Sequence, residues 1–236
     1  MHFSLTRIAF TIMLGFCCLL TRAQPLEYNQ RVEDSILRAL PTAKDDTNKV
    51  MSMLTLAAMY LQRFDSANVM RWSNDARALS EKLDYKLGIL LAIGQKAFYH
   101  SVASNWPVAM QEINEGMRLS DGKDSSFIRF FYNLRVIIDN TRGNFKDAKH
   151  WAMMSLHDPN FEKEGVMGRW PTYMQLGIIY DNLEMIDSAS YYAEKCREMM
   201  TMAKFRDLEL NSWLVIGNVA RKRKQYEVAL SAYCHY

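Results

Sequence analysis

The sequence predicts an all-α fold, a right-handed α-α superhelix (solenoid) of about five helix-turn-helix repeats. Val69, Ala109, Ala148, Ala189 and Ala229 are separated by gaps of 40, 39, 41 and 40 residues. A fixed period in this range is typical of stacked helical repeats. Each of the five follows a short turn, and apolar residues spaced by three and four on both sides define two amphipathic helices. Five such hairpins in one register predict a continuous helical stack.

Residues 1–23 predict a signal peptide. Arg7 supplies the positive charge, Ile8 to Leu20 form an apolar run, and small residues around Ala23 suit a cleavage site. The apolar run is too short to span a bilayer comfortably. Cleavage near Ala23 would place the chain in the periplasm or another extracytoplasmic space. Lipid attachment at Cys17 or Cys18 is the minor alternative, because bulky residues precede both.

Residues 24–46 predict an N-terminal capping helix and a linker. Val32, Ile36 and Leu40 share one apolar face of this helix. Pro41 ends it, because proline cannot continue the helical hydrogen bonds. The opposite face is polar, as a cap on the end of a solenoid requires.

Residues 47–236 hold the repeats, and the fourth unit shows the pattern most clearly. Gly177 and Ala189 are small enough to let two helix backbones approach closely, while aromatic side chains fill the space beside them. The pattern in order is Tyr173, Leu176, Gly177, Tyr180, the turn Glu184-Met185-Ile186, Ala189, Ala193 and Cys196. Other units follow this frame, with turns at Ser104-Asn105-Trp106, Gly143-Asn144-Phe145 and Lys224-Gln225-Tyr226.

This pattern resembles the tetratricopeptide repeat (TPR), a helix-turn-helix unit with aromatic, Leu-Gly, aromatic and Ala positions at these spacings. The resemblance covers about residues 47–236, with the last repeat incomplete. The period exceeds the family's usual length of about 34 residues, and this long form is similar to repeats of exported and signalling proteins of bacteria. Some units depart from the family pattern: Lys96 and Arg135 replace a leucine, and His100 and Asp139 replace the second aromatic. An irregular helical bundle is the alternative fold.

The composition argues against a nucleic-acid partner. The chain has 29 basic and 26 acidic residues, and cleavage after Ala23 would remove Arg7 and Arg22 and leave 27 against 26. A nearly neutral chain lacks the positive surface on which phosphate binding depends. The run Arg221-Lys222-Arg223-Lys224 is better explained as a helix end, where basic side chains oppose the helix dipole.

The cysteines, histidines and methionines do not predict a disulfide, a metal site or any other cofactor. Cys196 and Cys234 lie on the second helices of successive units. Equivalent points on packed helices are about 8–10 Å apart, which is beyond the Cα separation that a disulfide tolerates. His150 and His157 could align, but no third ligand of suitable spacing accompanies them. The run Met199-Met200-Thr201-Met202 could suit copper. Methionines occur in every repeat, however, so core packing explains them better.

The sequence contains no Gly-rich phosphate loop, nucleophile elbow or His-Glu zinc pair, so we expect a protein without catalytic activity. The TPR resemblance implies that a partner binds the concave face, along exposed positions of the first helices. Asn side chains there could hold a peptide backbone, and Arg or Lys could take a carboxylate. The residues at these positions are Phe98, Phe130, Asn133, Ile137, Asn140, Met174, Ile178, Asp181, Asn182, Asn211, Asn218, Arg221 and Lys222.

The sequence therefore favours an exported interaction module that binds a peptide or a partner protein in its concave groove. The alternative is an extracytoplasmic input domain of a sensor kinase or transcription regulator, with an output region beyond residue 236. The last predicted helix stops within the fifth unit, so we expect either a longer chain or a partner that covers this end. Membrane association would come only from a downstream segment, and the oligomeric state is not predicted.

Overall fold

A computed structural model describes residues 30–120, 125–202 and 206–235, so the predicted signal peptide lies outside the described residues. The described chain is all-helical and contains no strand, which confirms the predicted fold class. The α-helices are α2 (Gln30–Ala39), α3 (Thr47–Gln62), α4 (Ser66–Lys82), α5 (Lys86–Val102), α6 (Trp106–Ser120), α7 (Ser125–Thr141), α8 (Phe145–Leu156), α9 (Val166–Asn182), α10 (Ile186–Met202), α11 (Arg206–Lys222) and α12 (Tyr226–His235). Two short 3-10 helices, η1 (Leu40–Thr42) and η2 (Phe161–Lys163), lie between them.

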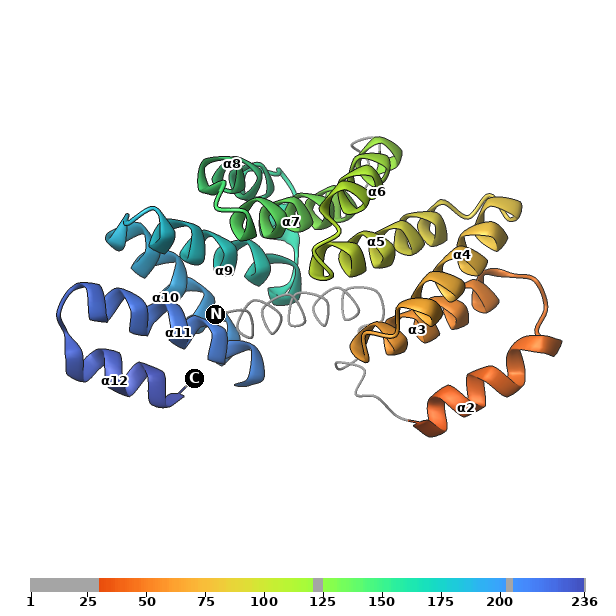
Figure 1. Ribbon diagram of the computed structural model, residues 1–236, viewed down its shortest axis with the longest axis horizontal. Helices are drawn as coiled ribbons and strands as arrows, with labels where there is room; N and C mark the ends of the chain where they lie inside the picture. The colour runs from red at the N-terminus through yellow and green to blue at the C-terminus, as the bar shows by residue number, and fades with distance from the viewer. Residues whose placement is uncertain (1–29, 121–124, 203–205, 236) are drawn as a thin grey trace. The chain divides into compact units, whose positions relative to one another are not determined.

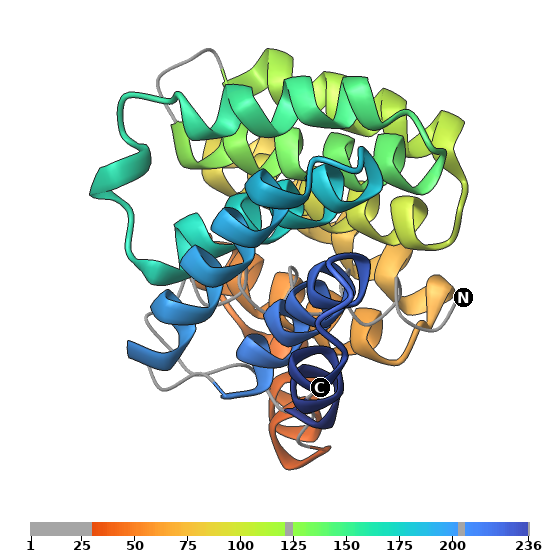
Figure 2. The ribbon, with the colours of Figure 1, turned by 90° about the vertical axis from the view of Figure 1, so that its left-hand side faces the viewer.

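The chain divides into two compact parts on either side of the bond between Leu134 and Arg135, within α7. In the amino-terminal part, α3 packs on α4, α4 on α5 and α5 on α6. In the carboxy-terminal part, α8 to α12 pack consecutively in the same way, and α9 also contacts α11. Figures 1 and 2 show these helices stacked in the order of the sequence within the carboxy-terminal part. Consecutive packing of this kind is the arrangement of a helical repeat solenoid.

The five positions of the forty-residue period are all in the core. Val69, Ala109, Ala148 and Ala189 have no exposed surface, and Ala229 is nearly as buried. Each is the fourth residue of the second helix of its hairpin, where a larger side chain would push the two helices apart. The period seen in the sequence therefore marks buried positions in the first turn of each second helix.

All five turns between first and second helices share one backbone geometry. The turn residue has a positive φ at Phe64, Ser104, Gly143, Glu184 and Lys224. In each turn the next residue donates its N–H to a carbonyl five residues earlier, as in the bond of 2.9 Å from Met185 N to Tyr180 O. This is the Schellman ending of a helix, which favours glycine at the left-handed position. Only one of the five turn residues is glycine.

Helix α2 lies in the segment for which the sequence predicts a capping helix, and it contacts α3 of the first hairpin. Ile36 lies against a core cluster of buried residues that contains Leu40 and Trp72. Glu33 is buried at the same contact, and its Oε1 accepts a hydrogen bond of 3.0 Å from Arg63. Val32, expected on the apolar face, is exposed instead. A partly buried ion pair thus supplements the apolar contact that the sequence pattern predicts.

Candidate functional site

Four apolar residues predicted on the concave face are buried. Phe98, Phe130, Ile137 and Met174 lie in the core, and Met174 is only 1% exposed. Helix α5 contacts α3, α4 and α6, and α9 contacts α8, α10 and α11, so Phe98 and Met174 are enclosed on several sides. The expectation that they are open to a partner therefore needs correction. Asn133 is also buried, and its Oδ1 accepts no hydrogen bond within the described part of the chain.

Four predicted polar residues of the carboxy-terminal part pair with one another. Asn182 donates a hydrogen bond of 3.1 Å from Nδ2 to Oδ1 of Asn140. Lys222 Nζ donates to the carbonyl oxygen of Asp181 at 2.6 Å and lies 2.8 Å from its Oδ1. Each pair joins the end of one first helix to the end of the next. We call Asn140, Asp181, Asn182 and Lys222 the polar ladder.

The ladder changes what these groups can offer to a ligand. The charge of Lys222 is already opposed by Asp181, so it is not free to take a partner's carboxylate. Asn182 is exposed, and Asn218 is half-buried and accepts a hydrogen bond of 2.9 Å from the Tyr233 hydroxyl. These two amides remain candidates for ligand contact.

The other predicted residues of this part have mixed environments. Ile178 is half-buried on the same face of α9 as Asn182, one helical turn away. Arg221 is exposed at the end of α11. Asn211 lies in α11, but its side chain is outside the described residues. The accessible part of the predicted site is therefore confined to α9 and α11.

A depression of about 410 Å³ lies beside the ladder, at the turn between α7 and α8. Leu183, the residue after Asn182, lines one side of the depression, and the first residues of α8 line the other. In the next unit the equivalent residue, Arg223, pairs with Asp187, whereas Leu183 offers no charge to Lys146. The lining residues are Gly143, Asn144, Phe145, Lys146, Asp147 and Leu183.

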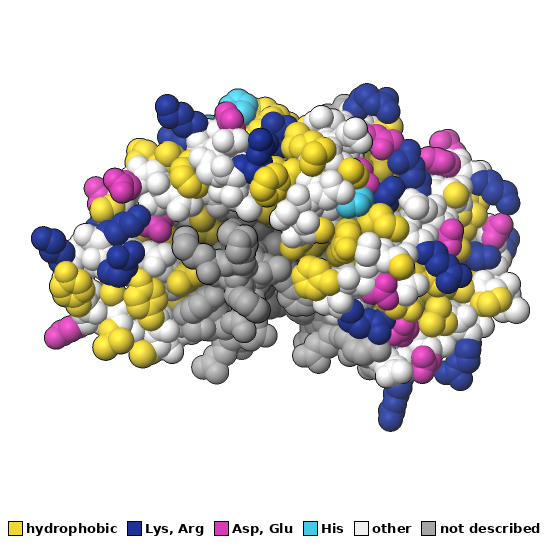
Figure 3. All heavy atoms as spheres, in the orientation of Figure 1, with side chains coloured by type: hydrophobic (Ala, Val, Ile, Leu, Met, Phe, Trp, Pro, Cys, Tyr) yellow, Lys and Arg dark blue, Asp and Glu magenta, His cyan; other side chains and the backbone are white. Residues whose placement is uncertain are grey.

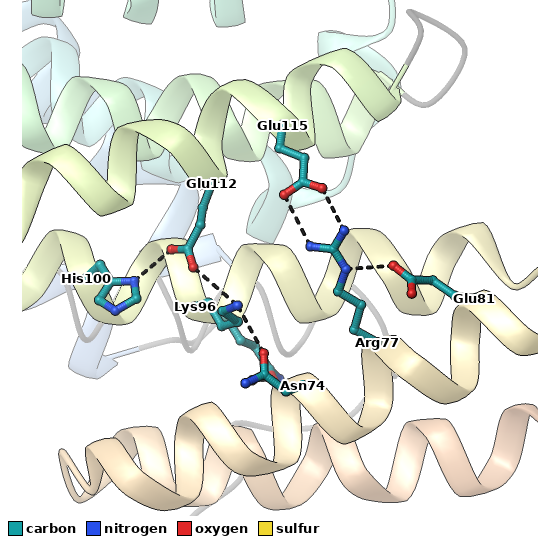
Figure 4. Close-up of polar contacts among 9 residues, drawn as sticks. Asn74, Arg77, Glu81, Lys96, His100, Glu112 and Glu115 are labelled. Atoms are coloured by element: carbon teal, nitrogen blue, oxygen red, sulfur yellow. Dashed lines mark hydrogen bonds and ion pairs between the residues drawn. The ribbon is translucent and has the colours of Figure 1, made fainter.

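A separate polar cluster joins the helices of the amino-terminal part (Figure 4). Arg77 donates two hydrogen bonds to the Glu115 carboxylate, at 2.7 and 3.2 Å, and a third of 2.8 Å to Glu81. The Arg77 guanidinium lowers the pKa of the Glu115 carboxyl, although partial burial opposes the shift. This bidentate pair links the second helices α4 and α6 directly.

The same cluster contains a second set of contacts centred on Glu112. His100 Nδ1 lies 2.8 Å from Oε2 of Glu112, and Lys96 Nζ lies 3.6 Å from Oε1. Lys96 also donates to Asn74 Oδ1 at 3.0 Å, which connects α4, α5 and α6. In the sequence, Lys96 and His100 stand out only as departures from the repeat pattern. Their spacing from Glu112, across a predicted turn, was the signal that could have revealed the pair.

Core packing accounts for some of the cysteines and methionines and not for others, since Cys196 and Met200 are buried whereas Cys234 and Met202 are exposed. Cys196 and Cys234 are both free, and burial raises the pKa of the Cys196 thiol to about 12. Met200 is buried while Met202 is 83% exposed, so the methionine run does not form one ligand set. Within the described ranges, no group of three or more His, Cys, Asp or Glu side chains could hold a metal ion.

On the face shown in Figure 3, basic and acidic side chains are interspersed with apolar ones. No helix in the described part of the chain has the length and apolar character needed to cross a membrane. No protein-family model matches the sequence, and no curated protein matches it either.

Proposed function

We propose that this chain is a TPR-like interaction module that binds an extended peptide segment of a partner protein, without catalysis. One observation carries the proposal: two amides on neighbouring first helices keep opposite hydrogen-bonding groups free. The ladder uses Nδ2 of Asn182, and the Tyr233 hydroxyl uses Oδ1 of Asn218. The Oδ1 of Asn182 and the Nδ2 of Asn218 have no hydrogen-bond partner among the described residues. An acceptor and a donor together match the N–H and C=O of a peptide backbone.

The surroundings of the two amides support this role. Ile178 and Leu214 are half-buried and lie one helical turn before Asn182 and Asn218 respectively, on the same faces. The helices α9 and α11 contact each other, and Lys222 of α11 donates a hydrogen bond to the Asp181 carbonyl, next to Asn182. A few oriented polar groups beside apolar side chains are typical of recognition sites. The internal hydrogen bonds of both amides fix their orientation before a ligand arrives, which lowers the entropy cost of binding.

Selection from a displayed library of random peptides, followed by calorimetry with the selected peptide, tests the proposal. Asn182→Ala and Asn218→Ala should each weaken binding about fivefold to tenfold, because each removes a hydrogen bond of roughly 1–1.5 kcal/mol. The control is Asn114→Ala, which changes an exposed amide of α6. Equal affinity of all three variants and the unchanged protein would contradict a peptide site at these amides.

The predicted export of the chain is a separate part of the proposal. The positive start and apolar run of residues 1–23 support it. N-terminal sequencing of the protein isolated from its native cell should find Gln24 as the first residue. An intact Met1 in the purified protein would contradict export through this segment.

A further inference from the structure

The depression at the start of α8, here called the α8 depression, lies next to the amide of Asn182. Leu183 is the following residue of the chain and lines the α8 depression, together with the turn before α8 and the first residues of α8. The volume of about 410 Å³ is in the range of small ligand sites. Successive residues of an extended peptide are only about 3.5 Å apart. A peptide held at Asn182 therefore has a side chain within reach of the α8 depression.

The next junction along the stack shows what the α8 depression lacks. Counted from the left-handed turn residues, Lys146 and Leu183 correspond to Asp187 and Arg223. Asp187 and Arg223 form an ion pair that joins the start of α10 to the end of α11. Leu183 has no charge with which to pair Lys146, so the equivalent position at the start of α8 stays open.

The turn residue before α8 is a second difference between the two junctions. Gly143 holds the left-handed position there, whereas Glu184 and three other residues with side chains hold it in the other hairpins. A Cβ built on Gly143 would find no atom of a non-neighbouring described residue within 4 Å. The α8 depression is therefore present because a turn side chain and a junction ion pair are both missing at one place.

The walls of the α8 depression combine apolar surface with an unpaired cation. Phe145 and Leu183 are half-buried and supply the apolar surface. Lys146 is exposed, and its ammonium group has neither a carboxylate nor an aromatic ring as partner among the described residues. By contrast, Lys149 of the same helix lies 4.9 Å over the Tyr180 ring. An aliphatic stem that ends in a carboxylate matches both the apolar walls and the free cation.

Asp147 also borders the α8 depression, but it lies on another side of α8. Consecutive residues of a helix point about 100° apart. In the next hairpin, the position of Lys146 belongs to Asp187, which reaches the end of α11, and the position of Asp147 belongs to Ser188. Asp147 is in the first turn of α8, where an acidic residue is stabilised by the helix dipole. Lys146 is therefore the charged residue at the position that faces the following first helix.

We propose that the α8 depression binds an acidic side chain of the peptide that Asn182 and Asn218 hold. The methylene groups of this side chain cover Phe145 and Leu183, and its carboxylate pairs with Lys146. The inference rests on the proposed peptide site and adds a charge preference to it. The partner segment is acidic at one fixed position, since complementary charges fix the register of a bound segment and exclude wrong partners.

Selection from a displayed library of random peptides, on the full chain, tests the proposal. The enriched peptides should share an acidic residue at one position. Replacement of this residue by glutamine in a synthetic peptide keeps the stem and removes the charge. Calorimetry should then show binding that is about threefold to fivefold weaker, which is the effect expected of a partly exposed ion pair.

Variants of the protein assign this preference to the α8 depression. Lys146→Glu should reverse it, so that a peptide with lysine at the fixed position binds more tightly than the acidic peptide. The double variant Lys146→Asp with Leu183→Arg repeats the residues of the next junction and should make the acidic and glutamine peptides equal. The control Lys163→Glu makes the same charge change at an exposed residue beyond the other end of α8 and should keep the preference. Circular dichroism checks the helical content of each variant.

The outcomes separate this inference from the proposed peptide site. Equal binding of the acidic and glutamine peptides, together with weaker binding to Asn182→Ala, would overturn the acidic preference and keep the site. A preference that Lys146→Glu and Lys163→Glu change equally would assign it to net charge and overturn the contact in the α8 depression. Failure to enrich any peptide, or enriched peptides that bind the unchanged protein, Asn182→Ala and Asn218→Ala equally, would overturn both proposals.

Discussion

The two parts of the molecule join their hairpins by different polar contacts on the same helical frame. In the amino-terminal part, Arg77 and Glu115 connect successive second helices. In the carboxy-terminal part, Asp181 and Lys222 connect the ends of successive first helices. The small buried positions and the turn geometry are shared by both parts. Helix packing therefore defines the repeat. The polar contacts at each junction, the contact between successive hairpins, differ from one part of the molecule to the other.

The shared frame should be the most sensitive feature. Gly177 is in the core contact of α9 and α10, where an added Cβ would lie 3.5 Å from the backbone nitrogen of Ala193. Gly177→Leu extends well beyond that distance and should lower the free energy of unfolding by about 3 kcal/mol through overpacking. Thermal or urea unfolding followed by circular dichroism measures the change. The control Gly177→Ala fits the space and should not destabilise; a loss equal to that of Gly177→Leu would contradict the packing argument.

The junction of the amino-terminal part should contribute less than the frame. Arg77→Met removes a bidentate contact and leaves Glu115 half-buried and unpaired, which should cost about 2 kcal/mol. A double-mutant cycle with Glu115→Gln should give a coupling free energy of about 1 kcal/mol. A coupling free energy of zero would show that the Arg77–Glu115 pair does not itself stabilise the fold.

This junction should also depend on pH. The folded-state pKa of Glu115 is lowered below the ordinary value of 4.5 by Arg77. Its stabilising effect is therefore complete above that ordinary value and is lost as the pH falls through the lower folded-state pKa. The stability difference between the unchanged protein and Glu115→Gln should shrink over this acidic range. A difference that stays constant from neutral to acidic pH would contradict the assignment.

The junction of the carboxy-terminal part should be weaker. Lys222→Met removes an ion pair and a hydrogen bond to a carbonyl, and should cost about 1 kcal/mol because Lys222 is only partly enclosed. The neighbouring exposed Arg221→Met is the control and should change stability by less than about 0.5 kcal/mol. If the two substitutions change the free energy of unfolding equally, the polar ladder does not stabilise the fold.

The smallest effect should come from the turns. Glu184 and Phe64 hold a left-handed backbone in different parts of the molecule, so replacement of either by glycine should stabilise by about 0.5 kcal/mol. Gly143→Ala, at the equivalent turn, should act in the opposite direction. Unfolding curves of the three variants measure both signs. A destabilised Glu184→Gly would mean that its side chain contributes more than its backbone strain costs.

The sequence by itself determined the repeat. The small residues at Ala109 and Ala189 and the turns at Ser104 and Lys224 are local signals, because helix pitch and turn chemistry act over a few neighbouring residues. Their regular recurrence is enough to predict the number and order of the hairpins. In the structure, Ala109 and Ala189 are buried and Ser104 and Lys224 lie in turns between helices.

Only the tertiary structure decided which side chains meet and which are accessible. Asn140 and Asn182, or Arg77 and Glu115, are about one repeat apart in the sequence, and their contact depends on the angle and offset between helices. The burial of Met174 likewise depends on neighbouring hairpins rather than on its own helix. The repeat period gives the number of residues between equivalent positions of successive hairpins. It does not give the angle and offset between neighbouring helices, and these decide which side chains are in contact.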